Sequence, residues 1–225
     1  MKTVIFDLDG TLADTSADLI AAANSCFRNL GYGDVLDPVG DAHTAFRGAR
    51  AMLGLGFSKV RPGFTEAEVM EQYPILLEAY AEEIDTHTRL YDGAVEAVEG
   101  LRTSGYAVGI CTNKPEDLAD RLLLRLGVRD LFGSMIGAKT VGVSKPDPKP
   151  YVAAVEEAGD GVVAAEVVVA VVAEVAVGGG DNLPVVRKVT FTASNTNNFK
   201  EPPVSGLGGF FVCGCLKKKP KIFVN

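Results

Sequence analysis

The sequence is poor in the residues that bind transition metals or form disulfide bridges. Its 225 residues include only four cysteines and two histidines. Neither His43 nor His87 has a motif around it. The cysteines, at positions 26, 111, 213 and 215, lack the paired spacing of a zinc site or a disulfide framework. Reduced thiols in a cytoplasmic protein are the simplest interpretation.

Positive charge is also scarce. The chain has 22 lysines and arginines against 29 aspartates and glutamates, which gives a formal net charge of −7. This balance argues against nucleic acid or an anionic membrane as the main partner, because both attract basic surfaces. An anionic substrate would therefore need a local basic pocket in an acidic protein.

Long hydrophobic runs are absent as well. The opening residues, MKTVIFDLDG, form too short and too acidic a run for a signal peptide. The stretch 161–177 is rich in alanine and valine, but it contains Glu166 and Glu174 and falls short of the roughly 20 apolar residues that a membrane span requires. We interpret it as a buried strand or helix and expect a cytoplasmic monomer or homodimer.

What is present is an alternation of apolar strands and amphipathic helices. Strands are expected at 3–6, 106–111 and 134–137, and helices at 15–30, after the capping box of Thr65 and Glu68, at 94–102, at 115–126 and after Pro148. Residues 31–60, with glycines at 48, 54 and 56, are expected to be rich in loops.

This order predicts an α/β fold, a Rossmann-like parallel sheet core with helices on both faces. Residues 14–90 read as an inserted, essentially helical domain, which leaves 1–13 and 91–225 for the core. Ligands bind at the carboxyl ends of the strands in open parallel sheets. Three polar motifs follow strands and would lie at that edge: FDLDGTLADT, CTNKP and SKPDP.

The first motif supplies two carboxylates, Asp7 and Asp9, separated by Leu8. If strand alternation continues past Phe6, both carboxylates face the same way. Two carboxylates so close do not both ionise easily without a cation between them, and oxygen ligands suit Mg²⁺. Asp7 could then act as a nucleophile, and Asp9 as a general acid.

The other two motifs supply groups that suit an anion. Thr112 offers a hydroxyl donor and Lys145 a positive charge, both of which would stabilise the oxygens of a transferring phosphoryl group. Asn113 could orient a substrate, and the helix start at Pro115 favours an anion nearby. An Asp-x-Asp-Gly sequence on its own is a common turn. The indication of a phosphoryl-transfer site therefore comes from the presence of all three motifs in this order along the chain.

Together these motifs resemble the haloacid dehalogenase superfamily, within it the phosphoglycolate phosphatase-like branch, over roughly residues 1–159. The resemblance implies that Asp7 is the nucleophile and Asp9 the acid/base residue, with Asp7 and the Asp9 carbonyl on Mg²⁺. It implies that Gly10, Thr112, Asn113 and Lys145 bind phosphate and that residues 14–90 form a helical cap domain. The presence of Asp9 argues against a dehalogenase.

The resemblance fails at the family's fourth motif, a Gly-Asp followed four positions later by a second acid. The expected position carries Ala170, although Glu174 stands where the second metal-binding acid belongs. The only later Gly-Asp is at 180–181. Either Asp181 serves through an altered loop, or the site is degenerate, or the sequence after about residue 159 is not accurate. The completeness of the first three motifs favours the last alternative.

Substrate choice would be made largely by the cap, where Arg47 and Arg50 could bind a substrate carboxylate or second phosphate. An equally good interpretation is that both arginines are simply solvated and have no binding role. A phosphonatase would need a cap lysine, and Lys59 is the only one between residues 14 and 90. The sequence thus predicts a phosphoric monoester hydrolase acting on a small phosphorylated metabolite. The alternatives are a β-phosphoglucomutase-like isomerase and a catalytically silent phosphate-binding protein.

Overall fold

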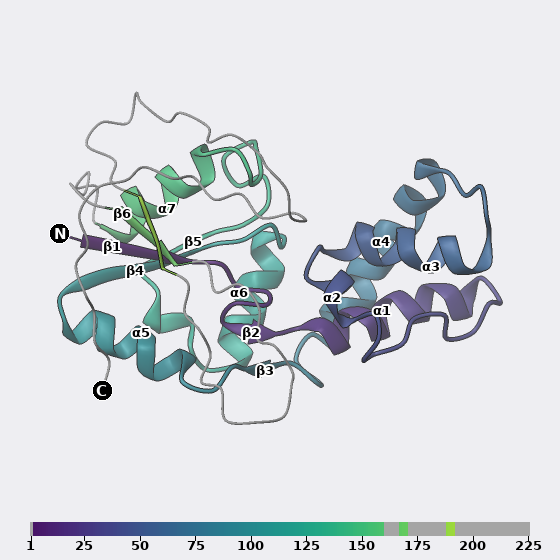
Figure 1. The fold of residues 1–225 in the computed structure, drawn as a ribbon, viewed down its shortest axis with the longest axis horizontal. Coiled ribbons are helices and arrows are strands. Elements are labelled where there is room, and N and C mark those ends of the chain that lie inside the picture. Colours follow the sequence, from purple (N-terminus) through teal and green to yellow (C-terminus); the bar gives the residue numbers. More distant parts are fainter. Residues whose placement is uncertain (1, 160–166, 171–187, 192–225) are drawn as a thin grey trace.

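The core of the protein is a five-stranded sheet in the order β5-β4-β1-β6-β7 (Figure 1). The computed structural model describes residues 2–159, 167–170 and 188–191. Four strands run parallel: β1 (Lys2–Phe6), β4 (Tyr106–Cys111), β5 (Ser134–Ile136) and β6 (Val167–Ala170). This confirms the predicted parallel core. The fifth strand, β7 (Lys188–Phe191), was not predicted and pairs antiparallel with β6.

Helices cover both faces of the sheet, as the alternation of elements predicts (Figure 1). Ile5, Cys111 and Ile136 pack on one face against α7 (Lys149–Ala158). Val4 and Phe6 belong to the larger cluster on the other face, because successive side chains of a strand point to opposite sides. That face is covered by α5 (Ala94–Thr103) and α6 (Glu116–Arg125), and the short η1 (Arg129–Leu131) follows α6.

Part of the chain between β1 and β4 forms a separate group of helices, which we call the helical unit. It consists of α1 (Ser16–Asn29), α2 (Ala42–Ala45), α3 (Ala49–Val60) and α4 (Glu66–Glu82) and lies to the right in Figure 1. Two short strands, β2 (Ala13–Asp14) and β3 (Arg89–Leu90), pair antiparallel where the chain leaves and re-enters the core. The division of the chain into domains at residues 14 and 90 stays a prediction.

The expectation that residues 31–60 are rich in loops was wrong for 42–60, because α2 and α3 occupy most of that range. Glycine inside a helix costs about 1 kcal/mol relative to alanine, so Gly54 and Gly56 pointed to a loop. The packing of the helical unit overrides that preference. A Cβ on Gly56 would lie 2.2 Å from Phe27 Cε2, so only glycine lets α3 approach the Phe27 ring this closely.

Local capping signals were more reliable. Thr65 caps α4 through the predicted capping box, with Glu68 N donating to Thr65 Oγ1 at 3.4 Å and Thr65 N donating to Glu68 Oε2 at 2.8 Å. The strand expected at 106–111 is β4 without any shift of its bounds. Pro148 directly precedes α7 as its N-cap residue, and Pro150 lies in the first turn, where a proline is tolerated.

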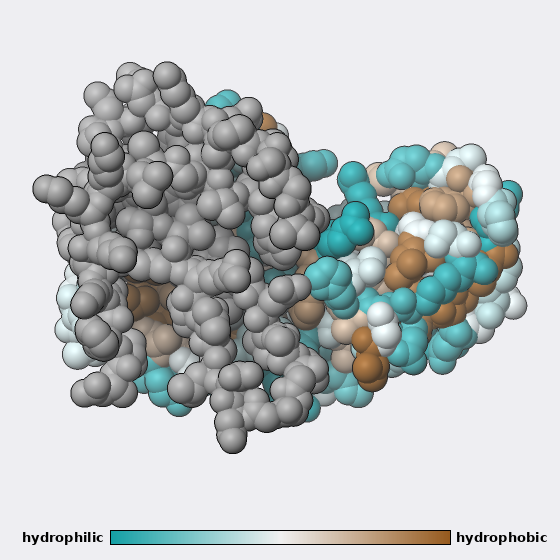
Figure 2. Space-filling model, in the orientation of Figure 1, coloured by the Kyte–Doolittle hydropathy of each residue, from teal (hydrophilic) through white to brown (hydrophobic). Residues whose placement is uncertain are grey.

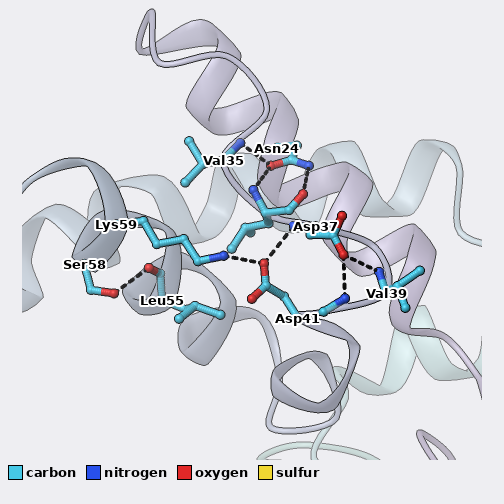
Figure 3. Close-up of polar contacts among 10 residues, drawn as sticks. Asn24, Val35, Asp37, Val39, Asp41, Leu55, Ser58 and Lys59 are labelled. Carbon is cyan, nitrogen blue, oxygen red and sulfur yellow. Dashed lines mark hydrogen bonds and ion pairs between the residues drawn. The ribbon is translucent and has the colours of Figure 1, made fainter. Parts of the chain in front are cut away.

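A polar network closes the long connection between α1 and α3 (Figure 3). Asn24 of α1 accepts hydrogen bonds from the amides of Val35 and Leu36 and donates to the Leu36 carbonyl. Lys59 of α3 pairs with Asp41 at 2.5 Å, and Asp41 also accepts from the amide of Asp37. Since the Lys59 ammonium is used in this way, the structure gives the phosphonatase alternative no support.

The surface of the helical unit mixes apolar and polar residues. Figure 2 shows hydrophobic residues interspersed with hydrophilic ones over its visible face. The exposed large apolar side chains of this unit are Leu30, Tyr32, Val39, Phe46, Met70 and Ile75. Within the part of the chain that the structure describes, no helix is long and apolar enough to cross a bilayer. Of the stretch 161–177, only β6 lies inside the described residues.

Candidate active site

The three motifs meet at the carboxyl edge of the sheet. Asp7 directly follows β1, Thr112 directly follows β4, and Lys145 lies in the connection between β5 and α7. The strands are neighbours, and the Thr112 amide donates to the Ile136 carbonyl at 2.9 Å. Adjacent parallel strands therefore bring residues more than a hundred positions apart into one site.

Asp7 and Lys145 form an ion pair at the centre of this site. Lys145 Nζ lies 2.8 Å from Asp7 Oδ2, while Asp7 Oδ1 accepts the Leu8 amide at 2.8 Å. The lysine side chain is about one-tenth exposed, at 11%, whereas the aspartate side chain is about one-third exposed, at 32%. Burial alone would lower the pKa of Lys145, but the Asp7 carboxylate outweighs it and holds that pKa above its usual value. The lysine thus stays charged beside an accessible carboxylate.

Asp9 is held by three side chains. Its Oδ1 lies 2.6 Å from Lys114 Nζ and accepts from Thr15 Oγ1 at 2.7 Å, and its Oδ2 faces Thr112 Oγ1 at 3.4 Å. Burial tends to raise the pKa of Asp9, yet the neighbouring ammonium of Lys114 and the hydrogen bonds bring it below its usual value. Asp7 and Asp9 are therefore each paired with a different lysine.

Gly10 turns the chain after these carboxylates. Its φ of +74° lies in the left-handed region that favours glycine, and its amide donates to the Ala13 carbonyl at 2.9 Å. A Cβ at Gly10 would lie 2.9 Å from Phe46 Cδ1. The segment between α2 and α3 therefore contacts the turn that carries Asp7 and Asp9.

Asn113 is tied to the backbone of Lys145. Its Oδ1 accepts the Lys145 amide at 2.9 Å, and its Nδ2 donates to the Lys145 carbonyl at 3.2 Å. This two-way contact fixes the chain from which the Lys145 side chain reaches Asp7. The structure thus shows the Asn113 amide bound to the Lys145 backbone, and a contact between Asn113 and substrate stays a prediction.

The two arginines of the helical unit lie differently. The Arg50 guanidinium stacks over the Tyr73 ring, 5.0 Å from its centroid, so it is engaged within the helical unit. Arg47 is exposed and directly follows Phe46, whose ring touches the turn at Gly10. Of the two, Arg47 belongs to the segment that contacts the site.

Oxygen atoms that suit a hard cation are partly in place. The Asp7 carboxylate and the Asp9 carbonyl share one turn, and within the described ranges nothing donates a hydrogen bond to that carbonyl. The same ranges contain no group of three or more His, Cys, Asp or Glu side chains suited to a metal. Ala170 ends β6 level with Phe6. Glu174 and Asp181, which could complete the donor set, lie outside the described residues.

Sequence reasoning missed two partners of Asp9, namely Lys114 and Thr15. Lys114 stands inside the CTNKP motif, and a lysine three positions after the end of a buried strand is the signal that could have marked it. It also reaches Tyr80 of α4, and this contact across 34 positions leaves no local trace in the sequence.

A hollow of about 660 Å³ lies elsewhere on the core, and of the positions singled out in the sequence it includes only Pro115, at the start of α6. Its acidic lining residues, Glu116, Asp117, Asp120 and Glu157, outnumber the basic ones, Arg129 and Lys139. An anionic ligand would be repelled there, so we place the candidate site at the carboxyl edge instead.

This fold places the chain among α/β proteins that bind a ligand at the carboxyl edge of a parallel sheet. The sequence model of the haloacid dehalogenase-like hydrolases matches residues 4–171, and the chain belongs to that family. The resemblance found in the sequence is thereby confirmed.

Among its relatives, a phosphoglycolate phosphatase of Agrobacterium fabrum is 34% identical over 69% of this chain and 66% of its own length. An N-acetylmuramic acid 6-phosphate phosphatase of Pseudomonas putida is 32% identical over 68% of this chain and 67% of its own length. The matched region thus spans about two thirds of each relative's length. The sequence predicted a hydrolase similar to phosphoglycolate phosphatases, and the names of these relatives agree with that prediction.

Solved structures confirm the fold. A protein of Haemophilus somnus, described as a predicted phosphoglycolate phosphatase, superposes with a TM-score of 0.58 and 25% identity over 71% of this chain and 72% of its own. A Thermotoga maritima protein, provisionally named a β-phosphoglucomutase, superposes with a TM-score of 0.52 and 24% sequence identity over 75% of each chain. At 24% identity, the similarity to the Thermotoga maritima protein is evidence for a shared fold only.

Proposed function

We propose that this protein is a magnesium-dependent phosphatase of small phosphorylated metabolites and works through an aspartyl-phosphate on Asp7. The observation that carries this proposal is the ion pair of Asp7 and Lys145, 2.8 Å apart, beside Asp9 and Thr112 at the carboxyl edge. A nucleophilic carboxylate, a second carboxylate and a fixed cation are the groups that phosphoryl transfer through a covalent enzyme requires.

In the first step, an oxygen of Asp7 attacks phosphorus and the bond from phosphorus to the ester oxygen breaks. The negative charge of the phosphate bound beside Asp9 favours the protonated form of this side chain, which gives its proton to that leaving oxygen, so the product departs as an alcohol. Lys145 and Thr112 stabilise the oxygens that carry the transferring charge. The Leu8 amide on Asp7 Oδ1 keeps the carboxylate oriented while its other oxygen faces Lys145.

In the second step, Asp9, now ionised, takes a proton from water. The resulting hydroxide attacks the phosphorus of the aspartyl-phosphate, and the bond to Asp7 breaks. Phosphate leaves, and both carboxylates return to their starting states. Once the proton is gone, the Lys114 ammonium, which holds the pKa of Asp9 below its usual value, keeps the carboxylate ionised, the form that can accept this proton.

Magnesium would be held by the Asp7 carboxylate, the Asp9 carbonyl and an acid after β6, of which Glu174 and Asp181 are the candidates in the sequence. When bound, the ion would neutralise the negative charge of the phosphate and of Asp7. This donor chemistry, all oxygen, fits a hard cation.

The substrate proposed is a small phosphorylated acid or sugar, like those named for the relatives. Arg47, next to the Phe46 ring that touches Gly10, would meet its second anionic group, and residues 14–90 would act as a cap domain. We further propose that the protein works in the cytoplasm as a monomer or homodimer, with neither nucleic acid nor a membrane as partner.

The test is phosphate release from 2-phosphoglycolate and a panel that includes N-acetylmuramic acid 6-phosphate, with and without Mg²⁺. Wild type should release phosphate only with the ion. Asp7→Asn should be inactive, while Asp117→Asn, an exposed change on α6, should behave as wild type. Exchange of phosphate between sugar positions without release would favour the isomerase, and no turnover on any substrate would favour a silent binding protein.

A further inference from the structure

Lys114 is a buried cation that the two steps above do not use. Its side chain is only 7% exposed, and its ammonium lies 2.6 Å from Asp9 Oδ1. The same ammonium donates to Tyr80 Oη at 2.9 Å and lies 4.6 Å from the centroid of the Tyr80 ring. These contacts occupy the ammonium within the protein, so it does not reach towards solvent or a bound phosphate as Lys145 can.

The contacts of Lys114 determine how the Asp9 carboxylate is turned. Lys114 and Thr15 both bind Oδ1, which leaves Oδ2 facing the Thr112 hydroxyl. Two donors on one oxygen restrict rotation about the final side-chain bond and present the other oxygen to the reacting phosphate. The Lys114 amide also donates to Thr112 Oγ1 at 3.1 Å, so one residue orients both groups.

Tyr80 gives Lys114 an anchor outside the core. It lies on α4 and is 2% exposed. The adjoining end of the helical unit is held on α6, where Arg121 donates to the Ala81 carbonyl at 3.1 Å and Arg125 pairs with Asp85 at 2.7 Å. Tyr80 is thus held firmly in place. The variant Tyr80→Phe removes only its hydroxyl, which is the group that binds Lys114.

We propose that Lys114 is a positioning residue for Asp9 in the phosphatase reaction and that Tyr80 anchors it from the helical unit. The proposal rests on the proposed function, because it acts through Asp9 as the proton donor. It gives α4 a part in arranging the acid/base residue, in addition to any contact that the helical unit makes with substrate.

The nature of the leaving group separates positioning from other roles. An alkyl phosphate such as 2-phosphoglycolate needs a proton on its leaving oxygen, whereas the nitrophenolate of p-nitrophenyl phosphate departs without one. The ratio kcat/KM reports the first irreversible step, in which this proton is transferred. A misplaced Asp9 therefore impairs the alkyl substrate selectively. Loss of a nearby positive charge, or a distorted site, impairs both substrates alike.

The experiment measures kcat/KM on both substrates, with Mg²⁺, for the full chain and its Asp9→Asn, Lys114→Met and Tyr80→Phe variants. Asp9→Asn should lose about 100-fold or more in kcat/KM on the alkyl substrate relative to the aryl one. Lys114→Met should show the same selectivity, about tenfold, and Tyr80→Phe about threefold, as expected for one hydrogen bond. Arg125→Met, the matched control, removes a contact to the same end of the helical unit and should leave the ratio unchanged.

Equal losses on both substrates in Lys114→Met and Tyr80→Phe would overturn the positioning role, as would the same selectivity in Arg125→Met or a gain of activity on the alkyl substrate. If Lys114→Met does not fold by circular dichroism, Tyr80→Phe decides alone. Should Asp9→Asn itself show no selectivity, the proposed function fails, and the role of Lys114 with it. Selectivity in Asp9→Asn but in neither other variant would reject the positioning role alone.

Discussion

Asp18 is a buried carboxylate whose removal should destabilise the fold without touching the candidate site. It lies on α1, is 3% exposed, and accepts hydrogen bonds from the chain that leads into β3. The donors are the His87 amide at 2.9 Å and the Thr88 amide and hydroxyl, each at 2.8 Å. One side chain thus joins the outgoing and returning connections of the helical unit.

The magnitude follows from these three donors. In Asp18→Ala they lose their acceptor, and each buried donor left unsatisfied costs about 1–3 kcal/mol. Allowing for relaxation and some water, we expect a loss of about 4 kcal/mol in the free energy of unfolding. Asp18→Asn keeps one oxygen but loses the charge and directs an amide donor at the His87 amide, so we expect about 2 kcal/mol.

Urea unfolding followed by circular dichroism measures both losses. The matched control is Asp34→Asn, which removes one partner of the exposed ion pair with Arg28 and should change stability by less than about 0.5 kcal/mol. For a chain of this size, 4 kcal/mol corresponds to a fall in Tm of about 10 °C. If Asp18→Ala unfolded within 1 kcal/mol of the control, these hydrogen bonds could not have the weight given to them here.

Two further changes test the local geometry of the site. Gly10→Ala should destabilise the protein by about 2–3 kcal/mol in urea unfolding, because the new Cβ adds a 2.9 Å contact with Phe46 to the strain of a positive φ. Gly127 has φ +70° with open space around it, so Gly127→Ala should lower the free energy of unfolding by only about 1 kcal/mol. Equal losses in the two variants would show that the contact with Phe46 adds nothing to the cost at Gly10. Asn113→Ala should lower kcat/KM about tenfold with Tm nearly unchanged, because it frees the Lys145 backbone, and wild-type kinetics would refute that role.

Much of the core could be predicted from the sequence because its signals are local. A buried strand that ends in a polar motif is visible in a dozen residues, and adjacent parallel strands then bring the motifs to one edge. Asp7 and Lys145 meet for this reason. The capping box at Thr65 is equally local, since both of its hydrogen bonds form within four residues.

The features that sequence reasoning missed depend on contacts between distant elements. Gly56 reads as a helix breaker until the ring of Phe27 is known to occupy the space beside it. Tyr80 lies on the buried face of α4, but nothing near it in the sequence indicates that Lys114 is its partner. The identity of the metal-binding acid of the fourth motif stays a prediction, because Glu174 and Asp181 lie outside the described residues.

The central claim, that Asp7 becomes phosphorylated, is tested most directly by trapping the intermediate. Wild-type protein mixed with 2-phosphoglycolate and Mg²⁺ is quenched in acid within the first turnover, digested, and analysed by peptide mass spectrometry. We predict one added phosphoryl group on the peptide that contains Asp7, located on that residue by fragmentation and absent from Asp7→Asn. Turnover of 2-phosphoglycolate without phosphorylation of Asp7, or with the phosphoryl group on another residue, would contradict the account.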